Sequence, residues 1–303
     1  MAGVIGTGNH PKALWPGIYA WFGREYEKHP LKCEMMFDMA NSSKKYEETV
    51  EATGFGMAIV KSEGGSISYD SETQGPASRF THATYGLGYI VTEEELEDNL
   101  YDTVAKGRTS ALAFSMRTTK ETVAANVLNR AFNSSYTGGD GVELISTAHV
   151  TEDGTQSNEL AVAADLSESS LEDLLVQISQ AKNSRGLQIQ VTPRKLLIAP
   201  SNQFEATRIL KSTLQSGTAN NDLNAVRDMG LMPEGFLVNH YFTDPDAWFV
   251  KTDAPSGLMG FNRRKLKFAK DNDFDTGNAK AKATERYSFG WTDMRGVYGS
   301  PGA

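Results

Sequence analysis

Residue types suited to acid–base or nucleophilic chemistry are sparse in this sequence. It contains five histidines and a single cysteine, Cys33, among 303 residues. No pair of histidines has a spacing such as the H-E-x-x-H of a zinc site. We therefore predict structural roles for His149 and His240, and a buried, unreactive thiol at Cys33. The sequence also lacks a G-x-S-x-G motif, which disfavours a serine hydrolase of that type.

Two short stretches resemble ligand-binding loops but do not meet their requirements. The turn at residues 138–141 is Gly-Gly-Asp-Gly, without the spacing and the lysine of a phosphate-binding P-loop. The aspartates of residues 271–275 alternate as in a calcium loop. However, the sixth position is Thr276 rather than glycine, and the twelfth is Lys282 rather than glutamate. We expect no catalytic residue, no cofactor and no metal ion.

Charge and hydropathy narrow the classes further. The net charge of −8 disfavours a protein that wraps nucleic acid. No run approaches the ~18 apolar residues that span a bilayer. A basic cluster could face a phosphate backbone or an acidic partner, although a solvated strand edge is the favoured interpretation. Its members are Arg263, Arg264, Lys265, Lys267 and Lys270. Together, these features favour a structural protein over an enzyme.

The dominant predicted element runs from Thr92 to Asn133, with no proline and one glycine, Gly107. As a single α-helix it would be ~60 Å long at roughly 1.5 Å per residue. Thr92 and Glu95 form a capping box at its start. Its apolar residues fall on two opposite faces. Either both faces of the helix are covered by other elements, or the helix breaks near Thr118. One long helix is the favoured interpretation.

The N-terminal region carries an aromatic stripe at helical spacing. Its members are Trp15, Ile18, Tyr19, Phe22 and Tyr26. The stripe either packs on its own domain or reaches a neighbouring subunit, because exposed aromatic patches mark interfaces.

A long polar excursion follows at residues 54–91. Phe55–Val60 and Tyr85–Thr92 are predicted strands, and the residues between them are mostly polar. A two-stranded flap without a core is marginally stable alone, so it needs another surface to lie on.

The remaining pattern mixes helices and strands without regular alternation, which predicts an α+β fold. A capping box at Ser169 and Glu172 heads one helix, and a further helix covers about 202–216. The predicted strands are 191–200, 236–240, 247–251, 266–268 and segments of 279–298.

The order of these elements resembles the major capsid proteins of tailed bacteriophages, and in particular the Mu-type major head subunit family. The resemblance is carried by the aromatic arm, the flap, the long helix and the run from Gly138 to His149. Further matching stretches are residues 119–121, 125–133, 196–200, 220–225, 246–249 and 286–293.

The resemblance implies a tailed-phage major-capsid fold with a defined division of the chain. The N-terminal arm would cover 1–48 and the extended loop 49–91. A peripheral domain would combine 92–137, with the spine helix at 92–133, and 255–303. An axial domain would cover 138–254. The expected intersubunit contacts are Trp15, Tyr19, Phe22, Tyr26, Phe80 and Tyr85.

The implied function is a structural subunit that self-assembles as hexamers and pentamers into an icosahedral shell around double-stranded DNA, in the virion and assembled in the bacterial cytoplasm. Expected partners are other copies of the chain, a portal protein at one vertex, a separate scaffolding protein and a decoration protein. The DNA is enclosed without sequence-specific binding, and no membrane is involved. The alternatives are a phage tail or tube subunit, or a soluble hydrolase with residues 54–91 as its lid.

Overall fold

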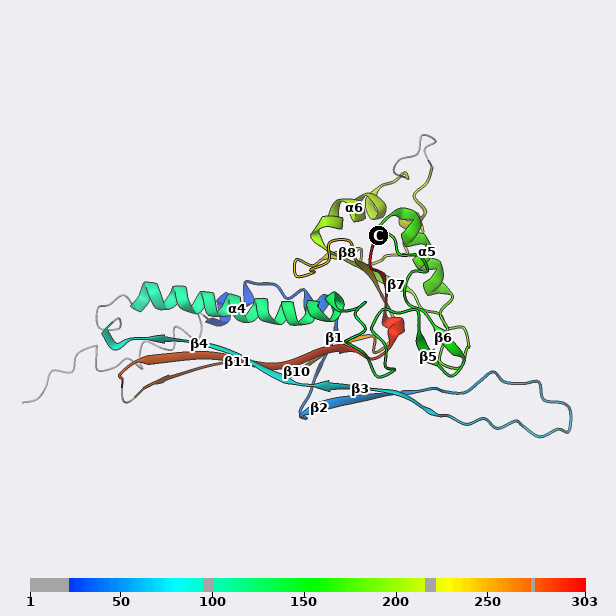
Figure 1. Ribbon diagram of the computed structural model, residues 1–303, viewed down its shortest axis with the longest axis horizontal. Helices are drawn as coiled ribbons and strands as arrows, with labels where there is room; N and C mark the ends of the chain where they lie inside the picture. Colours follow the sequence, from blue (N-terminus) through cyan, green and yellow to red (C-terminus); the bar gives the residue numbers. More distant parts are fainter. Residues whose placement is uncertain (1–21, 95–100, 216–221, 274–275) are drawn as a thin grey trace, which may run out of the picture.

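The computed structural model describes residues 22–94, 101–215, 222–273 and 276–303. The described residues form two four-stranded sheets and two two-stranded hairpins. The molecule is elongated: one sheet and a long helix lie at one end, and the second sheet with its helices forms a wider body (Figure 1). The mixture of helices and sheets confirms the predicted α+β class.

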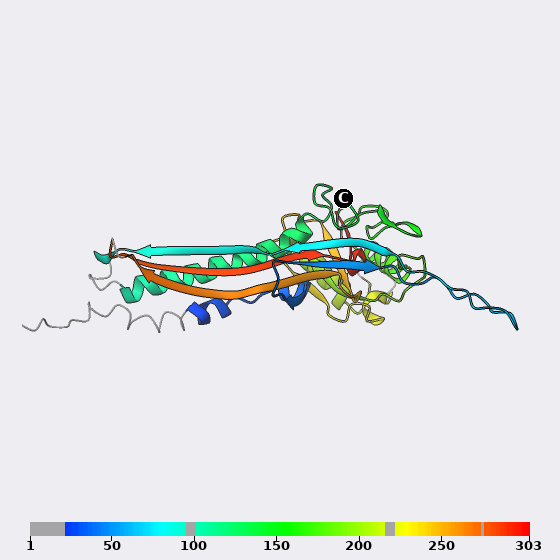
Figure 2. The same ribbon diagram turned by 90° about the horizontal axis from the view of Figure 1, so that it is seen from below.

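The long sheet has the order β1-β10-β11-β4. Its strands are β1 (Asp38–Asn41), β10 (Leu258–Asn272), β11 (Ala279–Trp291) and β4 (Ala83–Val91). β1 is parallel to β10, and the other pairs are antiparallel. Figure 2 shows β4, β11 and β10 running side by side along the molecule. On β11, buried and exposed side chains alternate at the start of the strand, because one face of this sheet is covered.

The helix α4 (Tyr101–Asn129) lies along this sheet (Figure 1). It is continuous over 29 residues and does not break at Thr118. The helix ends at Asn129, so the predicted end at Asn133 is wrong by one turn, and residues 130–132 form turns instead. The predicted capping box falls partly on residues 95–100, outside the described residues.

The buried side of α4 is one stripe rather than the predicted two faces. It includes Leu112, Ala113, Met116, Ala124, Ala125 and Leu128. Ala111 and Phe114 lie outside this stripe and are exposed. The stripe is hard to see in the sequence because its middle positions are the buried polar residues Lys120 and Glu121.

Different parts of the chain cover different lengths of this one stripe. Leu112 and Met116 pack with Phe22 and Phe268 in a cluster on the long sheet. Further along, Leu128 lies in a cluster that also contains α2 (Cys33–Met36) and residues of the second sheet. The C-terminal half of α4 therefore joins the two sheets into one body.

A buried ion pair lies at the centre of the α4 stripe. Lys120 Nζ lies 2.6 Å from Glu285 Oε1 on β11, and both side chains are at most 4% exposed. The Tyr26 hydroxyl donates to the other oxygen of Glu285 at 3.0 Å, and Lys120 also donates to Asn262 Oδ1 at 3.3 Å. Helix, sheet and N-terminal segment therefore meet at one polar cluster in which each charge has a partner.

The second sheet has the order β12-β9-β7-β8. Its strands are β7 (Pro193–Ile198), β8 (Phe236–Val238), β9 (Trp248–Thr252) and β12 (Val297–Ser300), close to the predicted positions. The associated elements are the β5–β6 hairpin (His149–Thr151 and Gly154–Gln156), α5 (Glu168–Ser179), α6 (Gln203–Lys211), α7 (Ala225–Asp228), and the 3₁₀ turns η3 (Pro200–Asn202) and η4 (Met294–Gly296). Leu171, Leu174 and Ile178 of α5 are buried in the core cluster of this sheet.

Two helix boundaries in this body differ from the prediction. The N-cap of α5 is Ser167, which forms a capping box with Ser170 rather than the predicted pair at Ser169 and Glu172. α6 ends at Lys211 rather than near residue 216, because the chain after it turns back and Leu214 bridges to Leu223.

The extended hairpin, Tyr46–Thr81, consists of β2 (Tyr46–Ala52), β3 (Gln74–Thr81) and a tip at residues 53–73. The tip contains no strand, so the predicted strand at Phe55–Val60 is wrong. The predicted strand at Tyr85–Thr92 corresponds to β4, which belongs to the long sheet rather than to the flap. The predicted loop boundary of 49–91 is therefore corrected to 46–81.

The buried ion pair generates a stability prediction. Glu285→Gln leaves the Lys120 ammonium without a countercharge in a dry site, so we expect the free energy of unfolding to fall by about 3–5 kcal/mol. Replacing both partners, Lys120→Met with Glu285→Leu, should recover most of this loss, because no buried charge remains. Urea titrations of the isolated chain, monitored by circular dichroism, measure the free energy of unfolding of the single and the double variant. Equal losses in the single and double variants would contradict the argument.

Candidate functional site

His149 is a structural residue, as predicted. It is 1% exposed, and its Nδ1 atom lies 2.5 Å from Asp140 Oδ2. Its Nε2 atom lies 3.1 Å from Asn158 Oδ1. Both ring nitrogens are engaged with the chain itself, so the imidazole is not free to act as a general base or a metal ligand.

Asn158 organises the segment around His149, and the sequence analysis missed it. Its Nδ2 group donates to the backbone carbonyls of Leu144, Met294 and Val297 at 2.8–3.1 Å. The side chain is fully buried. A buried amide that pairs with several backbone groups supplies, for a segment without regular structure, the hydrogen bonds that a neighbouring strand would supply in a sheet. No sequence motif marks this role, because its partners lie up to 139 positions away.

The glycine-rich turn at 138–141 serves close packing. A Cβ atom on Gly139 would lie 2.5 Å from the Ala77 carbonyl oxygen of β3. One on Gly138 would lie 2.1 Å from the Trp291 ring. These two positions admit only glycine, because the turn presses on the extended hairpin and on β11.

The other candidate chemical groups are also unsuited to catalysis. Cys33 is buried, and burial raises the pKa of its thiol, which keeps it protonated and unreactive. No cluster of three or more metal-ligating side chains occurs among the described residues, and no helix in that part of the chain is long and apolar enough to cross a membrane. Of the basic cluster, Arg264, Lys265 and Lys267 are exposed on β10 beyond Asn262, where pairing with β1 ends, whereas Arg263 and Lys270 are half-buried. The solvated edge is therefore met for three of the five residues.

The feature that does point to a function is the hairpin tip. It projects far beyond the rest of the molecule (Figures 1 and 2). Its large apolar side chains are Phe55, Met57, Ile59, Val60, Ile67 and Tyr69, and all of them are at least 60% exposed. A gathering of exposed apolar side chains on one projection is typical of a surface that another molecule covers.

The tip is nevertheless held in place at its root. Arg185 Nη2 lies 2.8–2.9 Å from both Asp70 carboxylate oxygens, and its Nη1 lies 2.8 Å from Glu152 Oε2. Asp70 also accepts a hydrogen bond from the Gly56 amide at 2.7 Å, which ties the two limbs of the tip together. The root is thereby fixed to the β5–β6 hairpin, while the far end of the tip extends free of the body.

This anchor is insensitive to mild acid. The Gly56 amide first, and then Arg185, lower the pKa of Asp70 to about 2. Because the folded-state pKa is depressed, the contribution of the pair is complete above the ordinary aspartate pKa and is lost only as the pH falls through about 2.

A second anchor holds β2. Arg295 is buried, and its guanidinium lies 3.3 Å from Glu51 Oε1 and 3.1 Å from Asp293 Oδ1. Its Nε donates to the Lys182 carbonyl at 2.6 Å. Arg295 therefore connects the strand that enters the tip with the second sheet, another role that the sequence did not indicate.

The six residues expected to contact a neighbouring subunit lie in different environments. Trp15 and Tyr19 fall outside the described residues. Phe22 and Phe80 are 3% and 5% exposed, in the core of the chain itself, and so are out of reach of a neighbour in this conformation. Tyr26 and Tyr85 are half-buried: Tyr26 bonds Glu285, and Tyr85 stacks on Tyr287. The apolar residues of the tip were not among the predicted contacts, although exposed hydrophobicity in a segment without a core was the available signal.

Comparison with known proteins identifies the family. A family model described as phage capsid protein matches residues 76–300, which is well over half of the chain. No curated protein sequence matches this chain.

Solved structures share the fold at low sequence identity. A virus-like particle from Pyrococcus furiosus has a TM-score of 0.50 at 12% identity, covering 94% of this chain and 98% of that one. A protein of Mycobacterium phage Patience has a TM-score of 0.54 at 11% identity, covering 99% and 92%. The capsid of a native GTA particle has a TM-score of 0.55 at 11% identity, covering 98% and 91%. Since the family model matches most of its length, the chain belongs to the phage capsid protein family and is a structural major capsid protein.

Proposed function

We propose that the extended hairpin lies across a neighbouring copy of the chain and that this contact closes a shell of hexamers and pentamers. The observation that carries the proposal is the apolar surface of the hairpin tip, which has no partner within the described part of the chain. Covering an apolar side chain of the size of Ile or Phe contributes about 1.5–3 kcal/mol. A neighbour that buries several of these side chains therefore supplies the missing core.

Each such contact can be modest, because an icosahedral shell repeats it. Closure makes the later contacts intramolecular and multiplies their effect. A rigid root with an extended tip suits this role, since the two arginine anchors fix the direction in which the tip leaves the body. Less entropy is then lost when it docks.

The division of the chain follows the same proposal. Residues 1–45 act as the arm, shortened from the expected 1–48 because β2 begins at Tyr46, and its part from Phe22 onward packs on its own subunit. The extended hairpin 46–81 acts as the loop that reaches the neighbour. The peripheral domain combines 82–137, including α4, with 255–303, and 138–254 forms the axial domain. Trp15, Tyr19, Tyr26 and Tyr85 remain the proposed arm and sheet contacts.

The shell encloses double-stranded DNA without reading its sequence. A net charge of −8 suits a container that does not grip its contents. The proposed partners are a portal protein at one vertex, a separate scaffolding protein and a decoration protein, with assembly in the host cytoplasm. The chain carries out no enzymatic reaction in this role.

The hairpin tip can be tested directly. Replacing Met57, Ile59, Val60 and Tyr69 with serine removes the apolar contact while leaving the body intact, because these side chains are exposed. We expect the variant to fold but not to form shells, as seen by negative-stain microscopy and sedimentation. The control is Ser66→Ala with Ser68→Ala, two exposed positions in the same tip, which should assemble normally. Normal shells from the serine variant would refute the proposal.

The anchor at Arg185 yields a separate prediction. Arg185→Ala removes the cation shared by Asp70 and Glu152, so the root of the tip should loosen. We expect faster hydrogen exchange and proteolysis at 53–73, together with slower shell formation, while the melting temperature of the isolated chain changes little. Lys182→Ala serves as the control, because its contact to Asp153 is exposed and long, at 3.9 Å. Unchanged exchange in the tip would show that the anchor is dispensable.

A further inference from the structure

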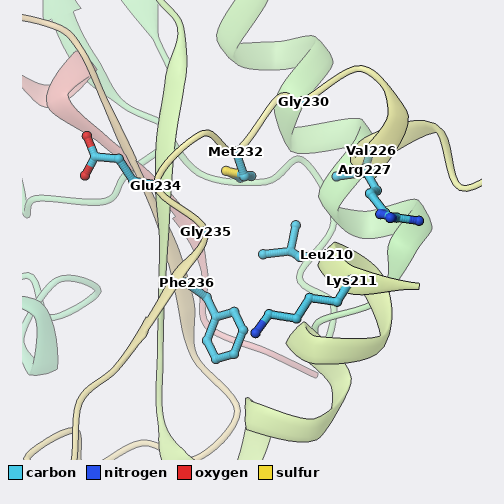
Figure 3. Close-up of a pocket in the computed structure, with 9 residues that line it drawn as sticks. All are labelled: Leu210, Lys211, Val226, Arg227, Gly230, Met232, Glu234, Gly235 and Phe236. Carbon is cyan, nitrogen blue, oxygen red and sulfur yellow. The ribbon is translucent and has the colours of Figure 1, made fainter. Parts of the chain in front are cut away.

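A pocket of about 330 Å³ lies beside β8, the edge strand of the second sheet (Figure 3). Its apolar lining includes Leu210, Val226, Met232 and Phe236, contributed by α6, α7, the loop that follows α7 and the start of β8. Lys211 and Arg227 also line it, and both are exposed. The pocket therefore combines an apolar interior with two cations.

These two cations lack acidic partners in the part of the chain that the structure describes. Neither Lys211 nor Arg227 forms an ion pair with any residue that the structure describes. The carboxylate that lines the same pocket, Glu234, is instead paired with Lys195 at 2.8 Å. Figure 3 shows Glu234 pointing away from the amine of Lys211, which extends toward Phe236. The pocket thus presents uncompensated positive charge around an apolar interior.

The opposite edge of the same sheet has the complementary character. The segment 158–165 runs along β12, where the Leu160 amide donates to the Gly299 carbonyl at 3.0 Å and the Ala164 amide donates to Ser300 Oγ at 3.1 Å. Since β12 and β8 are the two outer strands of the sheet, this segment and the pocket lie at opposite edges.

This segment presents an apolar side chain between carboxylates. Val162 is 77% exposed, and Asp165 is exposed as well. Burial first, and then the neighbouring Glu143, raise the pKa of Glu159. Among the described residues neither glutamate has a salt-bridge partner. Two adjacent carboxylates without a cation favour an external positive group.

We propose that the acidic segment 158–165 of one subunit docks on the basic pocket of the next, with Val162 against the apolar interior and Glu143 and Glu159 facing Lys211 and Arg227. The two surfaces are different and lie at opposite edges of one sheet. The contact is therefore head-to-tail and repeats around a ring. This inference rests on the proposed self-assembly and specifies the surfaces that join subunits within one ring.

Charge reversal provides the test. A pocket variant carries Lys211→Glu with Arg227→Glu, and a segment variant carries Glu143→Lys with Glu159→Lys. In each variant the docking surfaces acquire like charges, so we expect the concentration needed for assembly to rise by at least about tenfold. The control, Lys45→Glu with Lys265→Glu, makes the same charge change as the pocket variant at two exposed positions outside both docking surfaces and should assemble as the unmodified chain does.

The decisive experiment is to mix the pocket variant with the segment variant. The acidic pocket of one variant then meets the basic segment of the other, and the reverse pair also matches, so the formation of rings should return. Because the two variants must alternate, closed rings contain an even number of subunits, which permits hexamers and excludes pentamers. Val162→Asp, at an exposed position that does not affect folding, should weaken assembly alone. Circular dichroism and melting curves verify that each variant is folded.

The outcomes separate this inference from the proposed function. If the unmodified chain forms shells and both reversal variants do so equally well, the pocket contact is wrong and the shell function stands. If both variants fail and mixing does not restore assembly, the head-to-tail pairing is overturned. If the unmodified chain forms no shells or rings under any condition, both proposals fall.

Discussion

The burial of Lys120 against Glu285 is the interaction on which the arrangement of the molecule depends. A charge in a dry interior requires a partner at a fixed position, so the pair sets how α4 lies on β11. The same cluster takes in Tyr26 from the N-terminal segment and Asn262 from β10. Apolar packing alone would allow α4 to slide along the sheet, whereas this pair fixes both its register and its rotation.

Because the body has its own stable core, the extended hairpin that is attached to it does not need a hydrophobic core at its tip. Among the described strands, β2 and β3 pair only with each other, and the tip exposes apolar side chains that a stable monomer would bury. Arg295 and Arg185 connect its root to the body through Glu51 and Asp70. The chain therefore divides its hydrophobic surface between an internal core, which makes the subunit, and an exposed surface on the hairpin tip.

The sequence predicted the elements better than their contacts. Local signals placed β7, β8, β9 and most of α4 correctly. These elements are determined by the residue composition of a short segment and by the glycine and proline residues that end it. The buried stripe of α4 was missed, since Lys120 and Glu121 interrupt its apolar period and Glu285 lies 165 positions from Lys120. Phe55–Val60 was predicted as a strand from its local composition, but these residues form no strand in the structure, because local composition does not show whether a segment has a strand to pair with.

The same reasoning explains why unpaired charges are informative in this protein. Buried ion pairs such as Lys120–Glu285 are complete within the subunit and contribute to its folding. The charges beside apolar side chains at the pocket near β8 and along segment 158–165 have no ion-pair partner among the described residues. In this respect they resemble the apolar side chains of the hairpin tip, which also lack a covering surface there. A structural subunit requires surfaces that stay soluble apart and fit together when they meet. Moderate apolar patches flanked by opposite charges meet both requirements, because the charges keep each patch hydrated in the free chain and select its partner on contact.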